Sequence, residues 1–175
     1  MEKGFTLWFT GLSGSGKTTL SKMVTETLLE QTPDVELLDG DIIRTNLSKG
    51  LGFSKADRDE NIKRIGFVCQ LLSRHKTIAV VAAISPYEDV RRYNRERIRD
   101  YVEVFCKCDI ETLIARDVKG LYKRALKGEL KHFTGIDDPY EPPTNPEIIA
   151  YTGKESPRES HDRIINWLRN KGYIG

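Results

Sequence analysis

The stretch that decides the fold is "GLSGSGKT", residues 11–18, which matches the pattern G-x-x-x-x-G-K-[ST]. Its glycines allow the loop to wrap so that successive backbone N–H groups point inward at an anion. The apolar run "FTLWF" (5–9) before it predicts a buried strand, and the amphipathic stretch from Gly16 to about Gln31 predicts a helix that Pro33 stops. A strand before and a helix after are the context in which this loop binds the phosphates of a nucleoside triphosphate.

The side chains of this loop predict two cofactors, ATP and Mg²⁺. In loops of this pattern the lysine, here Lys17, reaches the β- and γ-phosphates, and the residue after it, Thr18, ligates Mg²⁺. The alternative is a flexible Gly/Ser loop that only resembles the pattern, and both flanking elements argue against it. The predicted nucleotide-binding residues are Gly11, Ser13, Gly14, Ser15, Gly16, Lys17, Thr18 and Thr19.

Along the rest of the chain, short apolar runs alternate with longer amphipathic ones. The apolar runs predict strands at 35–39, 77–84, 102–108 and 147–152, and the amphipathic runs predict helices at 55–75, 86–101, 109–117 and 156–172. This alternation predicts an α/β fold, a parallel five-stranded sheet flanked by helices on both faces, in one domain over residues 1–175. We expect strand 35–39 to lie beside the first strand, and ligands to lie at the carboxyl ends of the strands.

Composition limits the class of protein. The 28 Lys and Arg residues nearly balance the 26 Asp and Glu residues, giving a net charge of +2, which is less basic than a dedicated nucleic-acid binder. No apolar run is long enough to cross a membrane, and the first residues do not resemble a signal peptide. The odd cysteine count, Cys69, Cys106 and Cys108, is typical of a reducing compartment, so we expect a cytoplasmic protein. For the pair in "CKC", core packing is favoured over metal binding.

Two aspartates follow the second predicted strand, in "LLDGDIIR" (37–44). A phosphotransferase of this kind needs a metal partner and a group that orients or deprotonates the attacking hydroxyl. We assign Asp41 to the hydroxyl as the base and Asp39 to the metal or a water, although their spacing does not settle which is which. With Lys17 they are the catalytic candidates. The alternative is that Asp41 caps the short helix that follows, and one residue can do both.

Three further features predict an anionic, aromatic acceptor. Arg44 and Arg58, with Asn61 nearby, suit recognition of phosphate or sulfate oxygens. Phe53 and Phe133 are large rings on predicted loops, and they either sandwich a purine or pack against their own loops.

The run "RDVKGLYKRALKGELKHF" (116–133) is strongly basic. It is either a solvated helix face or, as its position after the fourth strand and its glycines suggest, part of a mobile basic lid over about residues 116–139. Such a lid would keep water from the donor phosphate.

These segments together resemble the adenylylsulfate kinase family of P-loop kinases. The shared pieces include "LLDGDIIRTNLSKGLGFSKADRDENIKRIG", "ISPYEDVRR" and "RDVKGLYKRALKGELKHFTGIDDPYEPP", and they run in family order from residue 11 to about 160. The resemblance implies a P-loop kinase fold and transfer of the ATP γ-phosphate to the 3′-hydroxyl of adenosine 5′-phosphosulfate. It also implies a requirement for Mg²⁺, a role in sulfate assimilation, and a homodimer.

Carried over position by position, the resemblance assigns the aspartate pair, the two arginines with Asn61, and both phenylalanines as stacking rings. It adds Ile84 and Ser85 as substrate-side backbone, Lys119 in the lid, and Arg116 near the donor nucleotide. Ile42 departs from the family, which often has asparagine there. Members also occur fused to ATP sulfurylase, the enzyme that makes their substrate, so fusion or association with it is possible.

Two other functions compete with this one. The first is a P-loop kinase of another small acceptor, such as shikimate, gluconate or a nucleoside monophosphate; two aromatic rings and two arginines fit a base with an anionic tail better. The second is a nucleotide-binding domain with weakened catalysis inside a fused synthase. Ile42 is the only feature that favours it.

Overall fold

Five parallel strands form one sheet in the part of the chain that the structure, a computed structural model, describes: residues 3–175. The order across the sheet is β2-β3-β1-β4-β5. The strands are β1 (Thr6–Thr10), β2 (Val35–Asp39), β3 (Ile78–Ala82), β4 (Tyr101–Cys106) and β5 (Ile148–Ala150). All five predicted strands are present, β2 with the predicted bounds and the other four shifted or shortened by a few residues, and the predicted fold class is confirmed.

The prediction that β2 lies beside β1 is wrong. Strand β3 lies between them: Val80 of β3 pairs with Leu7 of β1 on one side and with Leu37 of β2 on the other. Every residue of β3 is buried, whereas only Leu38 of β2 is fully buried, three of its residues are partly buried, and Glu36 is exposed. A uniformly apolar parallel strand is favoured inside a sheet, and a more polar one is tolerated at its edge.

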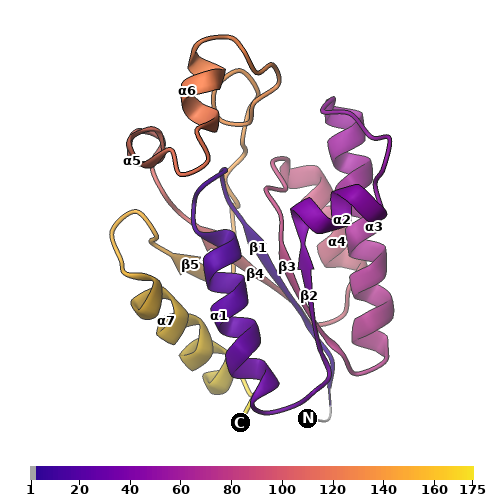
Figure 1. Cartoon of the computed structure of the whole chain (residues 1–175). Helices are drawn as coiled ribbons and strands as arrows, with labels where there is room; N and C mark the ends of the chain where they lie inside the picture. Colours follow the sequence, from indigo (N-terminus) through magenta and orange to yellow (C-terminus); the bar gives the residue numbers. More distant parts are fainter. Residues whose placement is uncertain (1–2) are drawn as a thin grey trace.

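Helices cover both faces of this sheet (Figure 1). Helices α1 (Lys17–Leu29) and α7 (Pro157–Asn170) pack on one face, over a core that includes Phe5, Leu7 and Phe9. Helices α3 (Lys55–Arg74) and α4 (Glu88–Arg97) pack on the other face, over Trp8 and its neighbours. Alternate residues of β1 therefore serve opposite cores, as the two-residue period of a strand requires.

Local signals at the helix ends work largely as the sequence predicts. Asp109 caps α5 (Ile110–Arg116) by accepting the Thr112 N–H at 2.8 Å. Ser156 forms a capping box with Glu159 at the start of α7, with Pro157 as the first helical residue. Of the two cysteines in "CKC", Cys106 belongs to the core, as predicted, whereas Cys108 is only partly buried and lies outside it. None of the described helices is both long and apolar enough to cross a membrane.

The remaining short helices lie at the carboxyl end of the sheet. Helix α2 (Gly40–Asn46) follows β2 directly, and α6 (Leu121–Leu126) lies within residues 116–139, which we call the lid segment. In Figure 1 the lid segment lies above the carboxyl ends of the strands, and the C-terminus lies at the opposite end of the molecule. The fold thus brings the loop after β1, the end of β2, the loop after β3 and the lid segment to one edge.

Candidate active site

The loop between β1 and α1 has the backbone shape of an anion cradle. Gly11 and Gly16 have φ values of 150° and 89°, which L side chains rarely adopt. A Cβ at Gly11 would lie 2.6 Å from the Ser15 Oγ and 2.7 Å from the Cys106 carbonyl oxygen. The buried Ser15 hydroxyl has no hydrogen-bond partner among the described residues. An unpartnered donor in a glycine-lined turn at a helix N-terminus fits a phosphate oxygen.

Lys17, the first residue of α1, is the buried cation of this cradle. Its Nζ donates to the Leu12 carbonyl at 2.7 Å. Desolvation lowers the pKa of the Lys17 ammonium to about 8, against smaller opposing contributions from Cys106, Asp41 and Asp39; nearby Lys119 lowers it further. A polyanion would stabilise the charged form of Lys17, so the site favours a bound phosphate chain.

The two aspartates divide their roles at the start of α2. Asp39 is the N-cap: its Oδ1 accepts the backbone N–H of Asp41 at 2.9 Å. The alternative that Asp41 caps this helix is therefore wrong, because Asp41 already lies in the first helical turn, where its side chain is free of that task. A Cβ at Gly40 would lie 2.8 Å from the Ala82 carbonyl oxygen, so the turn between the aspartates fits tightly against β3.

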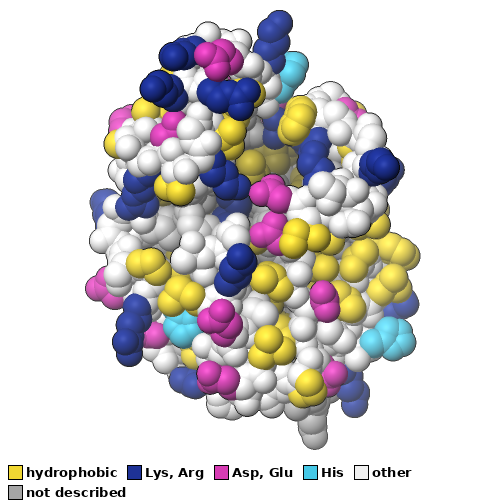
Figure 2. Space-filling model, viewed as in Figure 1, with side chains coloured by type: hydrophobic (Ala, Val, Ile, Leu, Met, Phe, Trp, Pro, Cys, Tyr) yellow, Lys and Arg dark blue, Asp and Glu magenta, His cyan; other side chains and the backbone are white. Residues whose placement is uncertain are grey.

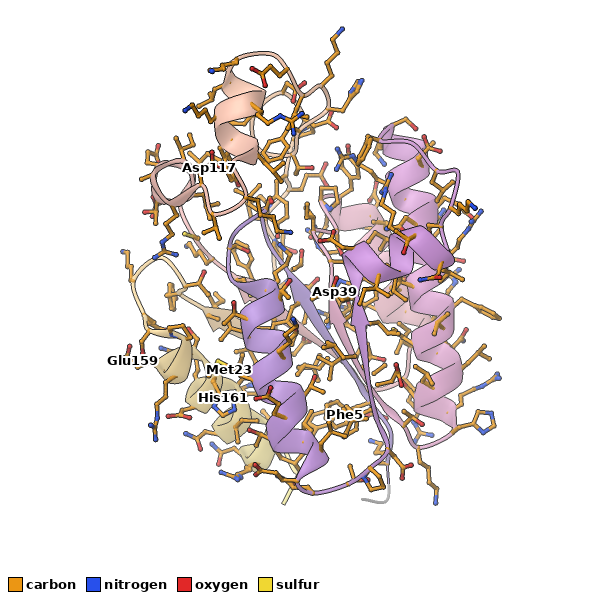
Figure 3. All side chains as sticks on the ribbon, viewed as in Figure 1. Phe5, Met23, Asp39, Asp117, Glu159 and His161 are labelled. Carbon is orange, nitrogen blue, oxygen red and sulfur yellow. The ribbon has the colours of Figure 1, made fainter. Side chains whose placement is uncertain are left out.

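The Asp41 carboxylate is exposed, and its Oδ2 lies 3.2 Å from the Nζ of Lys119 in the lid segment. Asp39 lies at the tip of β2, and Asp117 lies above it, between α5 and α6 (Figure 3). Thr18, at the start of α1, is also exposed. A hydroxyl and a carboxylate oxygen at one sheet edge are the hard ligands that Mg²⁺ prefers, so Thr18 and Asp39 fit a magnesium site completed by phosphates and water.

Arg58, near the start of α3, joins two loops. Its Nε donates to the Phe53 carbonyl at 2.8 Å. Its Nη1 donates to the Thr134 hydroxyl at 2.6 Å, and its Nη2 lies 3.2 Å from the Asp138 carboxylate and also donates to the His132 carbonyl. Only 9% of Arg58 is exposed. This arginine therefore fixes the position of the Phe53 loop relative to the loop that carries Phe133.

The Phe53 ring lies on a second guanidinium. The Cζ of Arg44 lies 4.2 Å from the ring centroid, and the Arg44 Nη2 donates to the Leu51 carbonyl at 3.0 Å and to the Gly52 carbonyl. Although Arg44 holds it, the ring is 56% exposed. An exposed aromatic face supported from behind by a cation is suited to stacking on a base.

Phe133 lies in the lid segment, where the Tyr122 ring packs edge-on at 5.1 Å between centroids. Asn61 is buried beside Arg58 on α3, and its Oδ1 has no hydrogen-bond partner among the described residues. The structure thus assembles Arg44, Phe53, Arg58 and Asn61 from α2, α3 and the loop between them.

In the loop after β3, the backbone carbonyls are already engaged. The Ile84 carbonyl accepts from the Thr10 hydroxyl at 2.6 Å, and the Ser85 carbonyl accepts from Arg91 Nη1 at 2.5 Å. The Ser85 Oγ accepts from the Trp8 indole N–H at 2.9 Å, and its φ is 48°, in the left-handed region. These contacts fix the loop beside the cradle.

On the other side of the cradle, Arg116 donates from Nη1 to the Thr152 carbonyl at 3.0 Å. A small pocket there includes Ser13, Gly14, Arg116 and Lys119 among its lining residues. The molecular surface is hollowed between the lid segment and the α2 and α3 side, with acidic side chains below the hollow and hydrophobic ones inside it (Figure 2). Donor-side and acceptor-side residues therefore flank one opening.

Two residues of this region were not predicted. Arg91 is almost completely buried in α4, and its Nη2 donates to the Glu141 carbonyl at 2.7 Å, just after the lid segment. Tyr122 is a buried residue of the lid segment itself, and its hydroxyl donates to the Ser13 carbonyl at 2.8 Å. Both lie in stretches that stand out for their charge. The one signal for Tyr122 was an aromatic residue inside an otherwise basic run.

Comparison with known proteins decides the family. The family model described as "Adenylylsulphate kinase" matches residues 3–151. The chain belongs to the adenylylsulphate kinase family. An adenylyl-sulfate kinase of Gloeothece citriformis is 55% identical over 173 residues, which is 99% of this chain and 98% of that relative. A probable bifunctional SAT/APS kinase of Sorangium cellulosum is 56% identical over 171 residues, and there the match spans 98% of this chain but only 29% of the relative.

Solved structures of adenylylsulphate kinases agree with this fold. The APS kinase of Mycobacterium tuberculosis in complex with AMPPNP and APS is 42% identical, with a TM-score of 0.90 over 95% of this chain and 98% of that one. A hexameric APS kinase from Thiobacillus denitrificans is 36% identical, with a TM-score of 0.75 over 99% of this chain and 30% of that one. A gluconokinase from Sinorhizobium meliloti, 16% identical with a TM-score of 0.64, shares the fold alone.

Proposed function

We propose that this chain transfers the γ-phosphate of ATP to the 3′-hydroxyl of adenosine 5′-phosphosulfate, giving 3′-phosphoadenylylsulfate and ADP in sulfate assimilation. The observation that carries the proposal is the shared opening, in which a phosphate cradle, an exposed aspartate and an arginine-supported aromatic ring meet. Family membership and the likeness to an APS kinase holding AMPPNP and APS support the choice of substrates.

In this mechanism the 3′-oxygen attacks the γ-phosphorus while the bond from that phosphorus to the oxygen shared with the β-phosphate breaks. Asp41 accepts the proton of the hydroxyl, and the electron pair of the broken bond leaves on ADP. Lys17 and the cradle N–H groups bind the triphosphate and stabilise the charge that develops on it. Thr18 and Asp39 would hold Mg²⁺, which would supply neutralisation of the phosphate charge.

The acceptor would be bound from α3, α2 and the lid segment. Phe53 and Phe133 would stack on the two faces of the adenine. Arg44, Arg58 and Asn61 would bind or orient the anionic tail. The loop after β3 would contribute Ile84 and Ser85 through atoms other than their engaged carbonyls. Since several Arg58 donors already bind protein acceptors, its main contribution would be the placement of both loops.

The lid segment would close over the phosphates as part of one kinase domain spanning residues 1–175. Lys119 already reaches Asp41 at 3.2 Å from the lid side. With an acceptor bound, this ammonium would move to the phosphates and free the carboxylate. Arg116 would lie along the donor nucleotide. Closure excludes water, which would otherwise hydrolyse ATP.

We also propose an assembly and a location for this chain. We expect a homodimer, although one solved relative is hexameric, so a measured mass in solution decides between these states. An association with ATP sulfurylase is consistent with the bifunctional relative. Three cysteines without disulfides support a cytoplasmic location.

A panel of acceptors tests the function. The purified chain is assayed with ATP and Mg²⁺ against adenosine 5′-phosphosulfate, gluconate, shikimate and AMP, with release of ADP as the readout. We expect turnover with the first acceptor only. Preference for another acceptor would show that a different kinase function is correct, and tight binding of both nucleotides without turnover would support the weakened-domain alternative.

The variant Phe133→Ala tests the acceptor site within the same assay. Removing one stacking ring should raise KM for adenosine 5′-phosphosulfate about tenfold or more, with a smaller effect on kcat and on the KM for ATP. Phe67→Ala is the matched control, because Phe67 is a 60% exposed ring on α3, outside the residues that we assign to the site. Equal effects of the two variants would remove Phe133 from the site.

A further inference from the structure

One side chain physically connects the two halves of the site. The Tyr122 hydroxyl donates to the Ser13 carbonyl of the cradle at 2.8 Å. The body of the same ring meets Phe133 edge-on, with 5.1 Å between centroids and an interplanar angle of 83°. Only 2% of Tyr122 is exposed. A rigid phenol therefore spans from the donor loop to the ring that would stack on the acceptor base.

The backbone around Tyr122 is fixed by its own set of contacts. The Asp117 carboxylate accepts the N–H of Tyr122 at 2.9 Å and the N–H of Lys123 at 3.0 Å, which ties the first turn of α6 to the end of α5. Gly120 begins the helix with a φ of 65°. The Tyr122 backbone is bound to Asp117 and its hydroxyl to Ser13. A shift of Ser13 that draws the Tyr122 ring with it must therefore also move α6.

We propose that Tyr122 is a positioning residue that couples the two substrates: by bonding to Ser13 it places Phe133 according to whether the cradle holds a nucleotide. This inference rests on the proposed function. It adds a coupling between nucleotide binding in the cradle and acceptor binding at Phe133. A triphosphate that binds the cradle restrains the loop that contains Ser13, the hydrogen bond passes this restraint to the Tyr122 ring, and the ring holds Phe133 in its stacking position. Phosphate in the cradle therefore strengthens acceptor binding, and by linkage the acceptor strengthens nucleotide binding by the same factor.

The Tyr122→Phe variant separates this role from packing. It removes the hydroxyl and leaves the ring that contacts Phe133, so the stacking surface is kept. Buried neutral hydrogen bonds of this kind change an equilibrium constant by about threefold to tenfold. A purely structural role would lower the melting temperature and weaken each ligand alone. A coupling role instead reduces the effect of one ligand on the other.

The test measures affinity for adenosine 5′-phosphosulfate by calorimetry, without nucleotide and with a saturating non-hydrolysable ATP analogue and Mg²⁺. The wild-type chain should bind the acceptor more tightly when the analogue is present. Tyr122→Phe should lose about threefold to tenfold of that enhancement. Acceptor affinity without the analogue should change less. Tyr93→Phe, which removes the hydroxyl of a ring on α4 that Arg97 and Lys63 contact, is the matched control and should behave as wild type.

A second variant, Phe133→Leu, protects the test against a folding artefact, because it keeps the hydrogen bond to Ser13 and removes the ring that receives the signal. It should also lose the enhancement. The proposal is overturned if the wild type shows no enhancement, or if Tyr122→Phe keeps all of it. If the wild-type chain binds neither the ATP analogue nor adenosine 5′-phosphosulfate, the proposed function itself has failed, and the inference falls with it.

Discussion

The donor cradle and the acceptor pocket share one edge of the sheet but are held together in different ways. The cradle is a single run of residues, 11–18, whose shape comes from backbone angles and from the start of α1. The acceptor pocket draws on α2, α3 and the lid segment, which lie far apart in sequence and meet through side chains such as Arg58. A contiguous loop keeps its form locally, whereas a pocket made from several segments depends on the residues that join them.

This contrast predicts that changes in the donor half alter chemistry or charge, and that changes in the acceptor half alter geometry. The largest loss of activity is expected from replacing Asp41, where the donor half and the acceptor half meet. Asp41→Asn should lower kcat by about 10²- to 10⁴-fold, since the amide cannot accept the proton of the hydroxyl. Affinity for ATP should stay near the wild-type value. Steady-state kinetics with both substrates varied would measure this.

Asp162→Asn is the control for Asp41→Asn, because Asp162 is an exposed aspartate on α7, with His161 rather than the opening beside it. A kcat for Asp41→Asn within a few-fold of this control would mean that Asp41 is not the base. Asp39 would then become the candidate to test.

The second effect concerns the residue that joins the acceptor loops. Arg58→Lys keeps the charge but cannot reach Phe53, Thr134 and Asp138 together, because an ammonium lacks the planar fork. KM for adenosine 5′-phosphosulfate should rise about tenfold to a hundredfold, and the melting temperature should fall. Nucleotide affinity should change little.

Arg92→Lys is the matched control for Arg58→Lys, since Arg92 is 60% exposed on α4 and pairs only with Asp89 among the described residues. If Arg58→Lys matched this control in both KM and melting temperature, the acceptor pocket would hold its shape without the guanidinium, and the contrast drawn above would be lost.

The smallest effect is a pH dependence confined to the donor half. Burial lowers the pKa of Lys17 to about 8, so the ligand-free protein loses this proton as pH rises through that value. A triphosphate needs the charged ammonium, so its binding above pH 8 requires proton uptake. Affinity should therefore fall by up to about tenfold per pH unit above pH 8. Calorimetric titration of the ATP analogue from pH 7.5 to 9.5 measures this.

Lys17→Arg stays charged over this range and should show a flat profile, whatever its absolute affinity. The stability of the ligand-free protein should change in the opposite sense. The unfolded lysine keeps its proton to about pH 10.5, so Lys17 makes folding more favourable as pH rises between 8 and 10.5. A wild-type affinity that is constant across the range would contradict the low pKa.

The same contrast explains what the sequence could predict. The cradle was predictable because its pattern, its strand and its helix are consecutive, and Asp109 and Ser156 act as caps within one turn. The position of β2 could not be predicted from order along the chain, since it depends on how β3 competes for the centre of the sheet. The N-cap of α2 could not be predicted either, because a shift of two residues in the start of the helix changes the cap from Asp41 to Asp39.

The acceptor half shows a further limit. Arg44, Arg58, Phe53 and Phe133 were found from residue type and family resemblance, but their partners were not. Nothing in the sequence shows that Arg58 bonds to Thr134 or that Tyr122 reaches Ser13, because these contacts cross 76 and 109 residues. Such long-range contacts arise only when the sheet brings the loops to one edge.

Gly40 has a consequence for how this site can change. With the Ala82 carbonyl 2.8 Å from the place of a Cβ, even alanine would lever α2 away from β3. Both aspartates would move with it, since Asp39 caps the helix and Asp41 lies in its first turn. Random replacement at position 40 should therefore return glycine alone among active clones. Activity should be as sensitive to substitution of this glycine as to substitution of the aspartates on either side.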